Sequence, residues 1–259
     1  MELQLTRNLK ELRLSGLAGT LDVRNQEAVA ADLTYLEFLE LLVQDEREIR
    51  RDRRVKRGIR SAGLDAGKTL DRFDFSFNRS INRKEIFDLA AGHYLDRHEN
   101  ILLFGPSGVG KSHLAQSLGH NAVLQDRRVL CRGALDLSVE MGEALDVGER
   151  KNIVARFLKP DLLIIDDFGL SPLPVAAAQY FLEILLRRYE TASTIFTSNR
   201  SLTDFGEVLG DPTAAMAILD RFLHHAHIIK IAGRSYRLQH PGAPGADAST
   251  TSDDNAGTV

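Results

Sequence analysis

The sequence contains little cysteine and no long apolar run. Its 259 residues include one cysteine, Cys131, which excludes an internal disulfide and a cysteine-based zinc site. No apolar stretch approaches the ~18 residues that a membrane-spanning helix requires. Met1 to Gln4 lack the basic and apolar regions of a signal peptide. These absences predict a cytoplasmic protein with no membrane partner, and the 43% hydrophobic content is ordinary for a soluble globular chain.

The net charge is small, but the charges are unevenly distributed. The segment 241–259 carries three aspartates and no basic residue, so it accounts for the whole formal net charge of -3. Basic residues are densest in the run Arg47–Arg60, whose only acidic residues are Glu48 and Asp52. Such a run is either a solvated helix face with internal ion pairs or a surface that contacts the phosphates of DNA. Further basic candidates for DNA contact are Arg79, Arg83, Lys84, Lys151 and Arg156.

Residues 1–62 are predicted to form a small N-terminal helical domain. Helices are expected at the N-terminus, over Thr20–Ala31 and from Thr34 onward. Thr34 and Glu37 have the spacing of a capping box, in which each side chain bonds the backbone N–H of the other residue. Ser61–Lys68, which contains two glycines, is expected to link this domain to the rest of the chain.

Residues 63–240 alternate between helical stretches and short apolar runs. This alternation predicts an α/β domain whose parallel sheet is covered by helices on both faces. Residues 241–259 are rich in small and polar side chains, cannot bury a core and are expected to be a disordered tail. The predicted strands are Asn100–Phe104, Arg128–Cys131, Asp161–Ile165, Thr194–Thr197 and Ile228–Ile231.

The phosphate-binding motif G-x-x-x-x-G-K-[ST] occurs at Gly105–Ser112. It lies where a P-loop requires, after the predicted strand that ends at Phe104 and before a helix that begins near Lys111. The glycines allow backbone N–H groups to surround the phosphates, and the helix adds its positive N-terminal end. Lys111 is expected to reach the β- and γ-phosphates of ATP, and Ser112 to ligate Mg²⁺. The predicted nucleotide-binding residues are Gly105, Pro106, Ser107, Gly108, Val109, Gly110, Lys111, Ser112 and His113.

Polar side chains follow two of the other predicted strands. Asp166 comes directly after a buried strand and is expected to complete the Mg²⁺ site with Ser112. Asp167 is placed to polarise an attacking water as a general base, and the alternative is that it only caps the following turn. Thr197-Ser198-Asn199 closes the next strand. A polar side chain there can lie between the two acids and contact the γ-phosphate or the water, although the same three residues also make a good turn.

In the order of these motifs, the chain resembles the AAA+ ATPases, within the clade that contains the initiator DnaA and the helicase loader DnaC. It is most similar to the IstB-type ATPases, which assist the transposase of an insertion sequence. The resemblance runs from the helical N-terminal segment to about Leu238. It is densest in Gly105–Ser112, Leu162–Leu173, Thr194–Asn199 and Gly210–Leu238.

This resemblance implies a fold, a mechanism and partners. The fold is a P-loop AAA+ domain with a five-stranded parallel sheet of order 5-1-4-3-2. Asn199 corresponds to sensor 1, and Arg221 to the arginine finger that a neighbouring subunit inserts toward the γ-phosphate; from its spacing alone, Arg221 would be an ordinary helix arginine. The implied function is ATP hydrolysis with Mg²⁺, ATP-dependent assembly of a homo-oligomer on duplex DNA, and assistance to a transposase. The predicted catalytic residues are Lys111, Asp167, Asn199 and Arg221.

Three other functions compete with this interpretation. A DnaC-like replicative helicase loader would share the same motifs and is the alternative. A small-molecule P-loop kinase is disfavoured, because tandem acids followed by Thr-Ser-Asn fit water activation better than phosphoryl transfer to a metabolite. A nucleotide-binding module without turnover is disfavoured because no catalytic position is missing.

Three weaker patterns favour structural roles. His224, His225 and His227 lack a suitable carboxylate or thiol spacing for a metal site. Cys131, at the end of a predicted strand, is expected to be a small buried side chain. Phenylalanines alternate in Phe73–Phe77, which predicts either a packed strand-like segment or a cover over the adenine.

Overall fold

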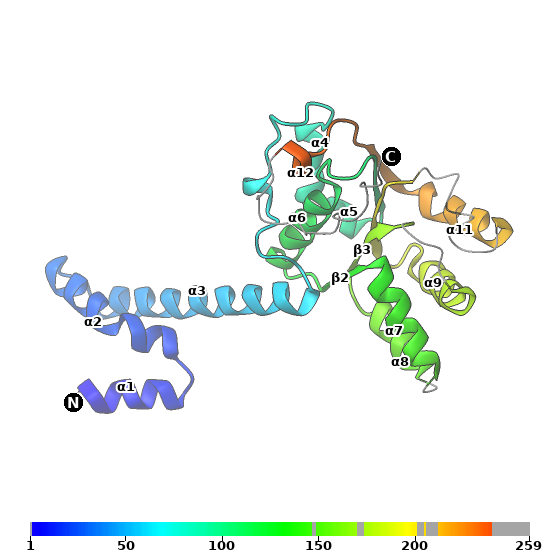
Figure 1. The fold of residues 1–259 in the computed structure, drawn as a ribbon. Helices are drawn as coiled ribbons and strands as arrows, with labels where there is room; N and C mark the ends of the chain where they lie inside the picture. Colours follow the sequence, from blue (N-terminus) through cyan, green and yellow to red (C-terminus); the bar gives the residue numbers. More distant parts are fainter. Residues whose placement is uncertain (1, 147–148, 170–173, 201–204, 206–211, 240–259) are drawn as a thin grey trace, which may run out of the picture. The chain divides into compact units, whose positions relative to one another are not determined.

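The computed structural model describes residues 2–146, 149–169, 174–200, 205 and 212–239. The chain divides into two compact units, Met1–Ser61 and Ala62–Val259. Figure 1 shows only helices in the first unit and a sheet flanked by helices in the second. The predicted tail 241–259 lies outside the described residues. Among those that are described, no helix is both long and apolar enough to cross a membrane.

The first unit is built from three helices, α1 (Glu2–Glu11), α2 (Ser15–Ala30) and α3 (Tyr35–Ala62). The predicted capping box at the start of α3 is confirmed. Thr34 N–H donates to Glu37 Oε2 at 2.8 Å, and Glu37 N–H donates to Thr34 Oγ1 at 3.4 Å. Two N–H groups that the first turn of a helix leaves without an intrahelical partner are thereby satisfied.

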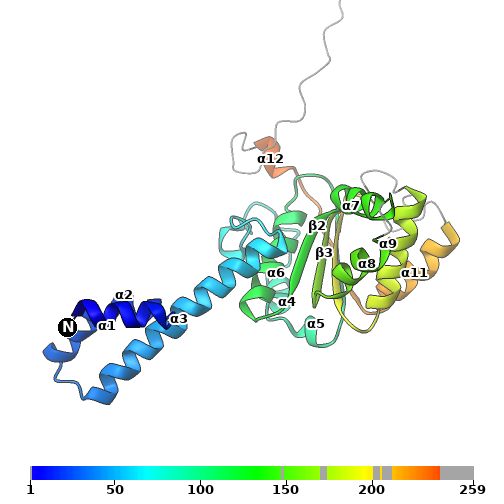
Figure 2. The same cartoon turned by 90° about the horizontal axis from the view of Figure 1, so that it is seen from below.

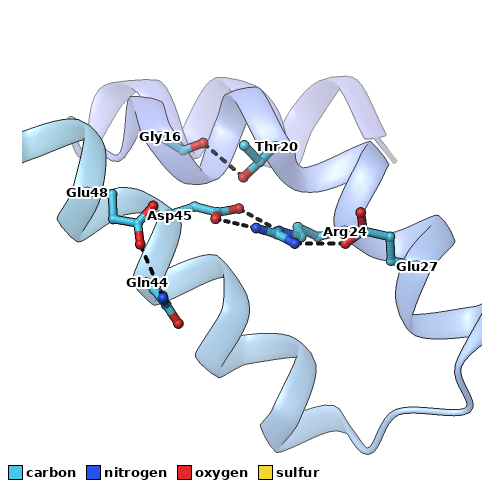
Figure 3. Close-up of polar contacts among 7 residues, drawn as sticks. All are labelled: Gly16, Thr20, Arg24, Glu27, Gln44, Asp45 and Glu48. Carbon is cyan, nitrogen blue, oxygen red and sulfur yellow. Dashed lines mark hydrogen bonds and ion pairs between the residues drawn. The ribbon is translucent and has the colours of Figure 1, made fainter. Parts of the chain in front are cut away.

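Charged hydrogen bonds hold α2 against α3. The helix α2 has no side-chain cap of its own, and Glu46 of α3 takes this role. Its Oε2 accepts from the N–H groups of Gly16 at 2.6 Å and Leu17 at 3.1 Å. Arg24 of α2 forms two hydrogen bonds with Asp45 of α3, at 2.8 and 2.7 Å (Figure 3). Both carboxylates are buried, so these bonds offset the desolvation of two charges.

The second unit contains a five-stranded parallel sheet of order β2-β3-β4-β1-β5. This is the predicted order 5-1-4-3-2 counted from the other edge, and the prediction is confirmed. Each strand overlaps the run from which it was predicted. The strands are β1 (Asn100–Phe104), β2 (Val129–Gly133), β3 (Leu162–Phe168), β4 (Ser193–Ser198) and β5 (Ala226–Lys230).

Helices cover both faces of the sheet, as the alternation of strands and helices predicted. In Figure 2 the strands separate α4, α5 and α6 from α8, α9 and α11. The first group is α4 (Arg83–Ala90), α5 (His93–Asp96) and α6 (Lys111–Leu124), preceded by the short helix η1 (Leu70–Arg72). The remaining helices are α7 (Ala134–Asp146), α8 (Arg150–Leu158), α9 (Val175–Arg188), α11 (Pro212–His224) and α12 (Tyr236–Gln239).

An aromatic core packs between the sheet and the helices α7, α8, α9 and α11. Phe168 of β3 stacks on Phe181 of α9 with 5.1 Å between ring centroids, and Phe196 of β4 lies 4.7 Å from Phe222 of α11. Burial of such rings is the largest apolar contribution that single side chains make to a core. It fixes β3 and β4, whose carboxyl ends carry the acidic and polar residues of the predicted site.

The segment expected to be a linker, Ser61–Lys68, begins where the two units divide and is hydrogen-bonded to α6. Asp65 N–H donates to Gln116 Oε1 at 2.9 Å, and Ser117 Oγ donates to the Lys68 carbonyl at 3.1 Å. Polar side chains of α6 thus satisfy backbone groups of this irregular stretch. The residues that follow α3 therefore pack against α6, the helix that begins at the P-loop.

Candidate nucleotide-binding site

The loop Gly105–Ser112 has a backbone that only glycine accommodates at its key positions. Gly105, Gly108 and Gly110 have φ values of 149°, 76° and 101°. A Cβ at Gly105 would lie 1.9 Å from the carbonyl oxygen of Ile231, and one at Gly108 would lie 2.0 Å from Ser235 Oγ. The glycines therefore permit both the left-handed backbone and the close approach of a neighbouring segment.

Lys111 places a buried positive charge over this loop. Its Nζ donates to the carbonyls of Gly105 at 2.8 Å and Pro106 at 2.7 Å, and its side chain is buried. Lys111 is also the first residue of α6, so the ammonium group and the positive end of the helix coincide. Together they form a site for anionic phosphate groups.

A bulge brings the two aspartates of β3 together. Ile165 pairs with Phe196 of β4, and the next pair is Phe168 with Ser198. Two residues of β3, Asp166 and Asp167, therefore lie opposite a single residue of β4, and Asp167 has a left-handed φ of 55°.

Consecutive side chains of a regular strand point to opposite faces, and a bulge can redirect them. Asp166 and Asp167 accordingly line the same groove, whose volume is about 680 Å³.

The single residue opposite the bulge is Thr197. Its buried hydroxyl donates to Asp166 Oδ1 and accepts from the N–H of Asp167 at 2.8 Å. The Thr-Ser-Asn pattern signalled that polar residues end this strand, but it did not show that Thr197 bonds both aspartates. Asn199 follows β4 directly and is exposed at the same edge of the sheet.

Sequence reasoning also missed Arg132 and Glu140, which line the groove beside the aspartates. Arg132 Nε donates to Glu140 Oε1 at 3.0 Å, and Arg156 of α8 donates to Glu140 Oε2 at 2.9 Å. These bonds join the end of β2 to α7 and α8. The available signal was the position of Arg132 near the carboxyl end of a parallel strand, where ligand sites gather in open α/β sheets.

The segment after β5 packs against the P-loop. Ile231 N–H donates to the Phe104 carbonyl at 2.8 Å, and Tyr236 N–H donates to the Gly108 carbonyl at 2.9 Å. The ring of Tyr236 meets Phe77 edge to face, with 4.9 Å between centroids. Tyr236 belongs to Gly210–Leu238, which was named only for its family resemblance, and the structure shows that it contacts the loop backbone.

The alternating phenylalanines 73, 75 and 77 do not form a strand; most of this stretch is turn. Phe73 lies against the P-loop, where a Cβ at Gly110 would come within 2.7 Å of its ring. It also packs on His113, with 5.1 Å between ring centroids. His113 Nε2 hydrogen bonds to the Thr69 carbonyl at 2.8 Å, which requires the proton on Nε2. Burial lowers the pKa of His113, which favours the neutral ring that this hydrogen bond and the contact with Phe73 hold in place.

Arg221 is the one predicted catalytic residue that the structure does not bring to this edge. It is exposed on α11 and lines a small cavity with Asn100 and Thr194. Asn100 is the first residue of β1 and Thr194 is the second residue of β4. The P-loop follows the other end of β1. The five-residue strand β1 spans about 13 Å at ~3.3 Å per residue. Arg221 therefore lies at the opposite edge of the sheet from Lys111.

The histidines near Arg221 have separate partners. His224 Nδ1 lies 3.3 Å from the Tyr189 hydroxyl, and His227 Nε2 lies 2.9 Å from Glu99 Oε2. Among the described residues, no group of three or more histidines, cysteines and acids could hold a metal ion. Cys131 is buried, as predicted.

A sequence profile of the IstB-like ATP binding proteins matches residues 7–243. The chain belongs to this family. It is 38% identical over 231 residues to the insertion sequence IS21 putative ATP-binding protein of Pseudomonas aeruginosa, covering 89% of this chain and 87% of the relative. It is 36% identical over 228 residues to the insertion sequence IS5376 putative ATP-binding protein of Geobacillus stearothermophilus, covering 88% and 91%. This IstB-like chain is thus an ATP-binding protein of the kind that insertion sequences encode.

Two solved structures share its fold. The DnaC helicase loader matches 64% of this IstB-like chain and 97% of its own with a TM-score of 0.56 and 20% identity. The replication initiator DnaA, bound to AMPPCP and single-stranded DNA, matches 66% of this chain and 51% of its own chain, with a TM-score of 0.54 and 21% identity. At such identities the likeness is one of fold, and it confirms the predicted AAA+ architecture.

The oxygen donors at the site fit Mg²⁺. Magnesium is usually held by one or two protein oxygen ligands together with the phosphates of a nucleotide. Ser112 lies in the first turn of α6, and the Asp166 carboxylate accepts one hydrogen bond, at Oδ1, among the described residues. Ser112 and Asp166 are therefore the residues of this IstB-like chain that would hold the ion.

Proposed function

We propose that this IstB-like chain hydrolyses ATP, assembles as a homo-oligomer on duplex DNA and assists the transposase of its insertion sequence. The observation that carries the enzymatic part is that five residues lie at or just after the carboxyl ends of the adjacent strands β3, β4 and β1. They combine a cation for phosphate, oxygen donors for a metal ion and a second carboxylate. The five are Lys111, Ser112, Asp166, Asp167 and Thr197.

Each of these residues has a distinct role in the proposed reaction. Lys111 binds the β- and γ-phosphates, and Ser112 and Asp166 hold Mg²⁺. When bound, the ion would neutralise charge on the phosphates. Asp167, whose carboxylate is exposed in the groove, accepts the proton of the attacking water. Asn199 orients that water or the γ-phosphate from the end of β4.

The position of Arg221 supports a composite site formed by two subunits. The sheet separates it from the P-loop of its own chain, and its side chain is exposed. No carboxylate among the described residues lies within ion-pair distance of it. An exposed cation at that edge, without an ion pair in the described part of the chain, is available to the γ-phosphate of a neighbouring copy, where an arginine finger stabilises the charge of the transferring group.

The basic run of α3 has two kinds of arginine. Arg50 pairs with Glu46 at 2.6 Å and donates to the Arg13 carbonyl, and Arg53 donates to Ser15 Oγ. These contacts hold the turn between α1 and α2. Arg47 and Arg51 are exposed, lie one helical turn apart and have no bonded partner among the described residues. We assign DNA phosphate contact to this second kind, because unpaired cations release condensed counterions when they bind phosphate.

The transposase is proposed as partner because the relatives are named for insertion sequences. The likeness to the DnaC loader is one of fold alone, so a helicase partner has less support. ATPase rate and sedimentation, each measured with and without duplex DNA, test the proposal. DNA should raise the rate and produce a larger ATP-dependent species that retains the transposase encoded beside this chain. An unchanged rate and size would instead favour a small-molecule kinase, and retention of a replicative helicase would favour a loader.

A further inference from the structure

We infer that Thr197 is a positioning residue for ATP hydrolysis, whose hydroxyl holds the metal-binding and the water-activating aspartates in one arrangement. The inference rests on the proposed function and assigns a role that neither the motif nor the family match supplies. Thr197 need not touch the phosphates itself. It acts on ATP through Asp166 and Asp167.

The hydroxyl of Thr197 bonds both acidic residues at once. A threonine hydroxyl has one hydrogen to donate and lone pairs to accept with. Thr197 donates to Asp166 Oδ1 and accepts from the N–H of Asp167 at 2.8 Å. Among the described residues no other group is bonded to the Asp166 carboxylate, so one oxygen is fixed and the other stays available as a ligand. A fixed ligand has less freedom to lose when an ion binds.

Thr197 also stabilises the unusual backbone of Asp167. Asp167 has a φ of 55°, a left-handed conformation that is unfavourable for any residue with a Cβ. The bond from its N–H to Thr197 Oγ1 stabilises that conformation. Because the left-handed residue forms the bulge, the same bond places the Asp167 carboxylate in the groove beside Asp166. One buried side chain therefore controls both acids.

The other buried hydroxyl residues of β4 have different hydrogen-bond partners. Ser193 Oγ donates to the Tyr94 carbonyl, and Ser198 Oγ donates to the Phe168 carbonyl. Thr194 Oγ1 accepts from the buried Arg188 at 3.1 Å. Each of these side chains satisfies a backbone group or a structural cation, and only Thr197 bonds the acids. Thr194 is thus a matched control, being a buried threonine on the same strand.

The test compares Thr197→Val, which keeps the shape of the side chain, with Thr197→Ser, which keeps the hydroxyl, and with Thr194→Val. Affinity for a fluorescent ATP analogue is measured with Mg²⁺ and with a chelator, together with kcat, KM and thermal unfolding. We expect Thr197→Val to bind like the wild type in chelator but to lose about 10- to 100-fold of the strengthening by Mg²⁺. Its kcat should fall by a similar factor, and Thr197→Ser should recover both. Thr194→Val should lose thermal stability without any change in the effect of Mg²⁺.

A double-mutant cycle separates positioning from folding. In an Asp166→Asn background, Thr197→Val should cause no further loss of the Mg²⁺ effect, because its target carboxylate is already absent. If Thr197→Val does not fold, Thr197→Ala against Thr197→Ser gives the same comparison. Wild-type dependence on Mg²⁺ in Thr197→Val, or equal losses in the Ser and Val variants, would overturn the assignment. If the wild type itself hydrolyses no ATP with or without DNA, the proposed function fails, while Mg²⁺-dependent binding still decides the role of Thr197.

Discussion

Replacing Arg221 by alanine should leave ATP binding nearly unchanged and nearly abolish hydrolysis. The binding site at Lys111 is a strand length away, about 13 Å at ~3.3 Å per residue, so losing the guanidinium removes no contact from its own P-loop. An arginine finger contributes about 10³- to 10⁵-fold in rate, which is about 4 to 7 kcal/mol of activation free energy at ~1.36 kcal/mol per tenfold. The measurement is single-turnover hydrolysis beside an independent titration of ATP affinity. Arg187→Ala is the matched control, since Arg187 is an exposed arginine of α9 whose ion-pair partner among the described residues is Glu183 of its own helix.

Mixing two variants shows whether Arg221 acts on the P-loop of a neighbouring subunit or on that of its own. Lys111→Ala should lose ATP binding but keep its arginine, and Arg221→Ala should keep its binding site but lack the finger. In a random assembly of equal amounts, about a quarter of the sites pair an intact P-loop with an intact neighbouring finger, so about a quarter of the wild-type rate should return.

Two results would refute this reasoning. Arg221→Ala could hydrolyse ATP at the wild-type rate, which would exclude a finger. Alternatively, the mixture could stay inactive although sedimentation of differently sized tagged chains shows that the two variants assemble together. Arg221 would then act within its own subunit or only stabilise α11.

Asp167→Asn keeps the size of the side chain but removes the base, so ATP should bind normally while single-turnover hydrolysis falls about 10²- to 10⁴-fold. Reversing Arg47 and Arg51 to glutamate should reduce the slope of log affinity for duplex DNA against log salt by roughly 2, at ~0.9 per phosphate contact. Acid should loosen α2 from α3. The hydrogen bond from the arginine of α2 lowers the pKa of Asp45; burial raises the pKa of Glu46, but the hydrogen bonds that it accepts leave it below the usual value. The stability that these two carboxylates contribute is present above their unfolded pKa values of about 4, and it is lost as pH falls through their lower folded pKa values. Amide exchange in α2, corrected for its intrinsic rate, should therefore rise below roughly pH 4.

Each of these outcomes has a control. Loss of ATP binding in Asp167→Asn would contradict its role as the base. Arg7→Glu with Lys10→Glu makes the same change of charge on α1 and should not alter the salt slope; a wild-type slope in the α3 variant would assign its run to folding or subunit packing. Replacing both acid groups by their amides should give fast exchange of α2 already at neutral pH, and an exchange rate that is independent of pH in the wild type would disprove the acid effect.

Much of the fold could be predicted because its signals are local. The strands are short apolar runs, the P-loop is a contiguous motif, and the capping box at Thr34 needs only two residues three positions apart. The bulge could not be predicted in this way. It depends on how β3 and β4 align, and Asp166 and Thr197 are 31 positions apart in the sequence. Alternation of side chains alone would send the two acids to opposite faces.

The same limit applies to Glu46, which caps α2 by accepting from the N–H of Gly16, 30 positions earlier. It directly precedes the basic run Arg47–Arg60, and nothing in its local sequence indicates that the structure buries it. Similarly, Ser61–Lys68 contained two glycines and no periodic pattern, which is typical of linkers. Its backbone is satisfied by side chains of α6, a helix that begins at Lys111. Such contacts between distant segments leave no trace in local periodicity.

The placement of the site also constrains the proposed assembly. If Arg221 completes a neighbouring site, each subunit offers the amino edge of its sheet to the carboxyl edge of the next. The two surfaces differ, so this contact is heterologous, and a two-fold symmetric dimer cannot satisfy both of its sites through it. Contacts of this kind close into rings or continue as helical filaments. Duplex DNA is itself a helix with a phosphate charge at regular intervals, so a repeating head-to-tail array would present Arg47 and Arg51 of every subunit to it in the same way. ATP would then stabilise the array at each subunit contact, and hydrolysis at that contact would release it.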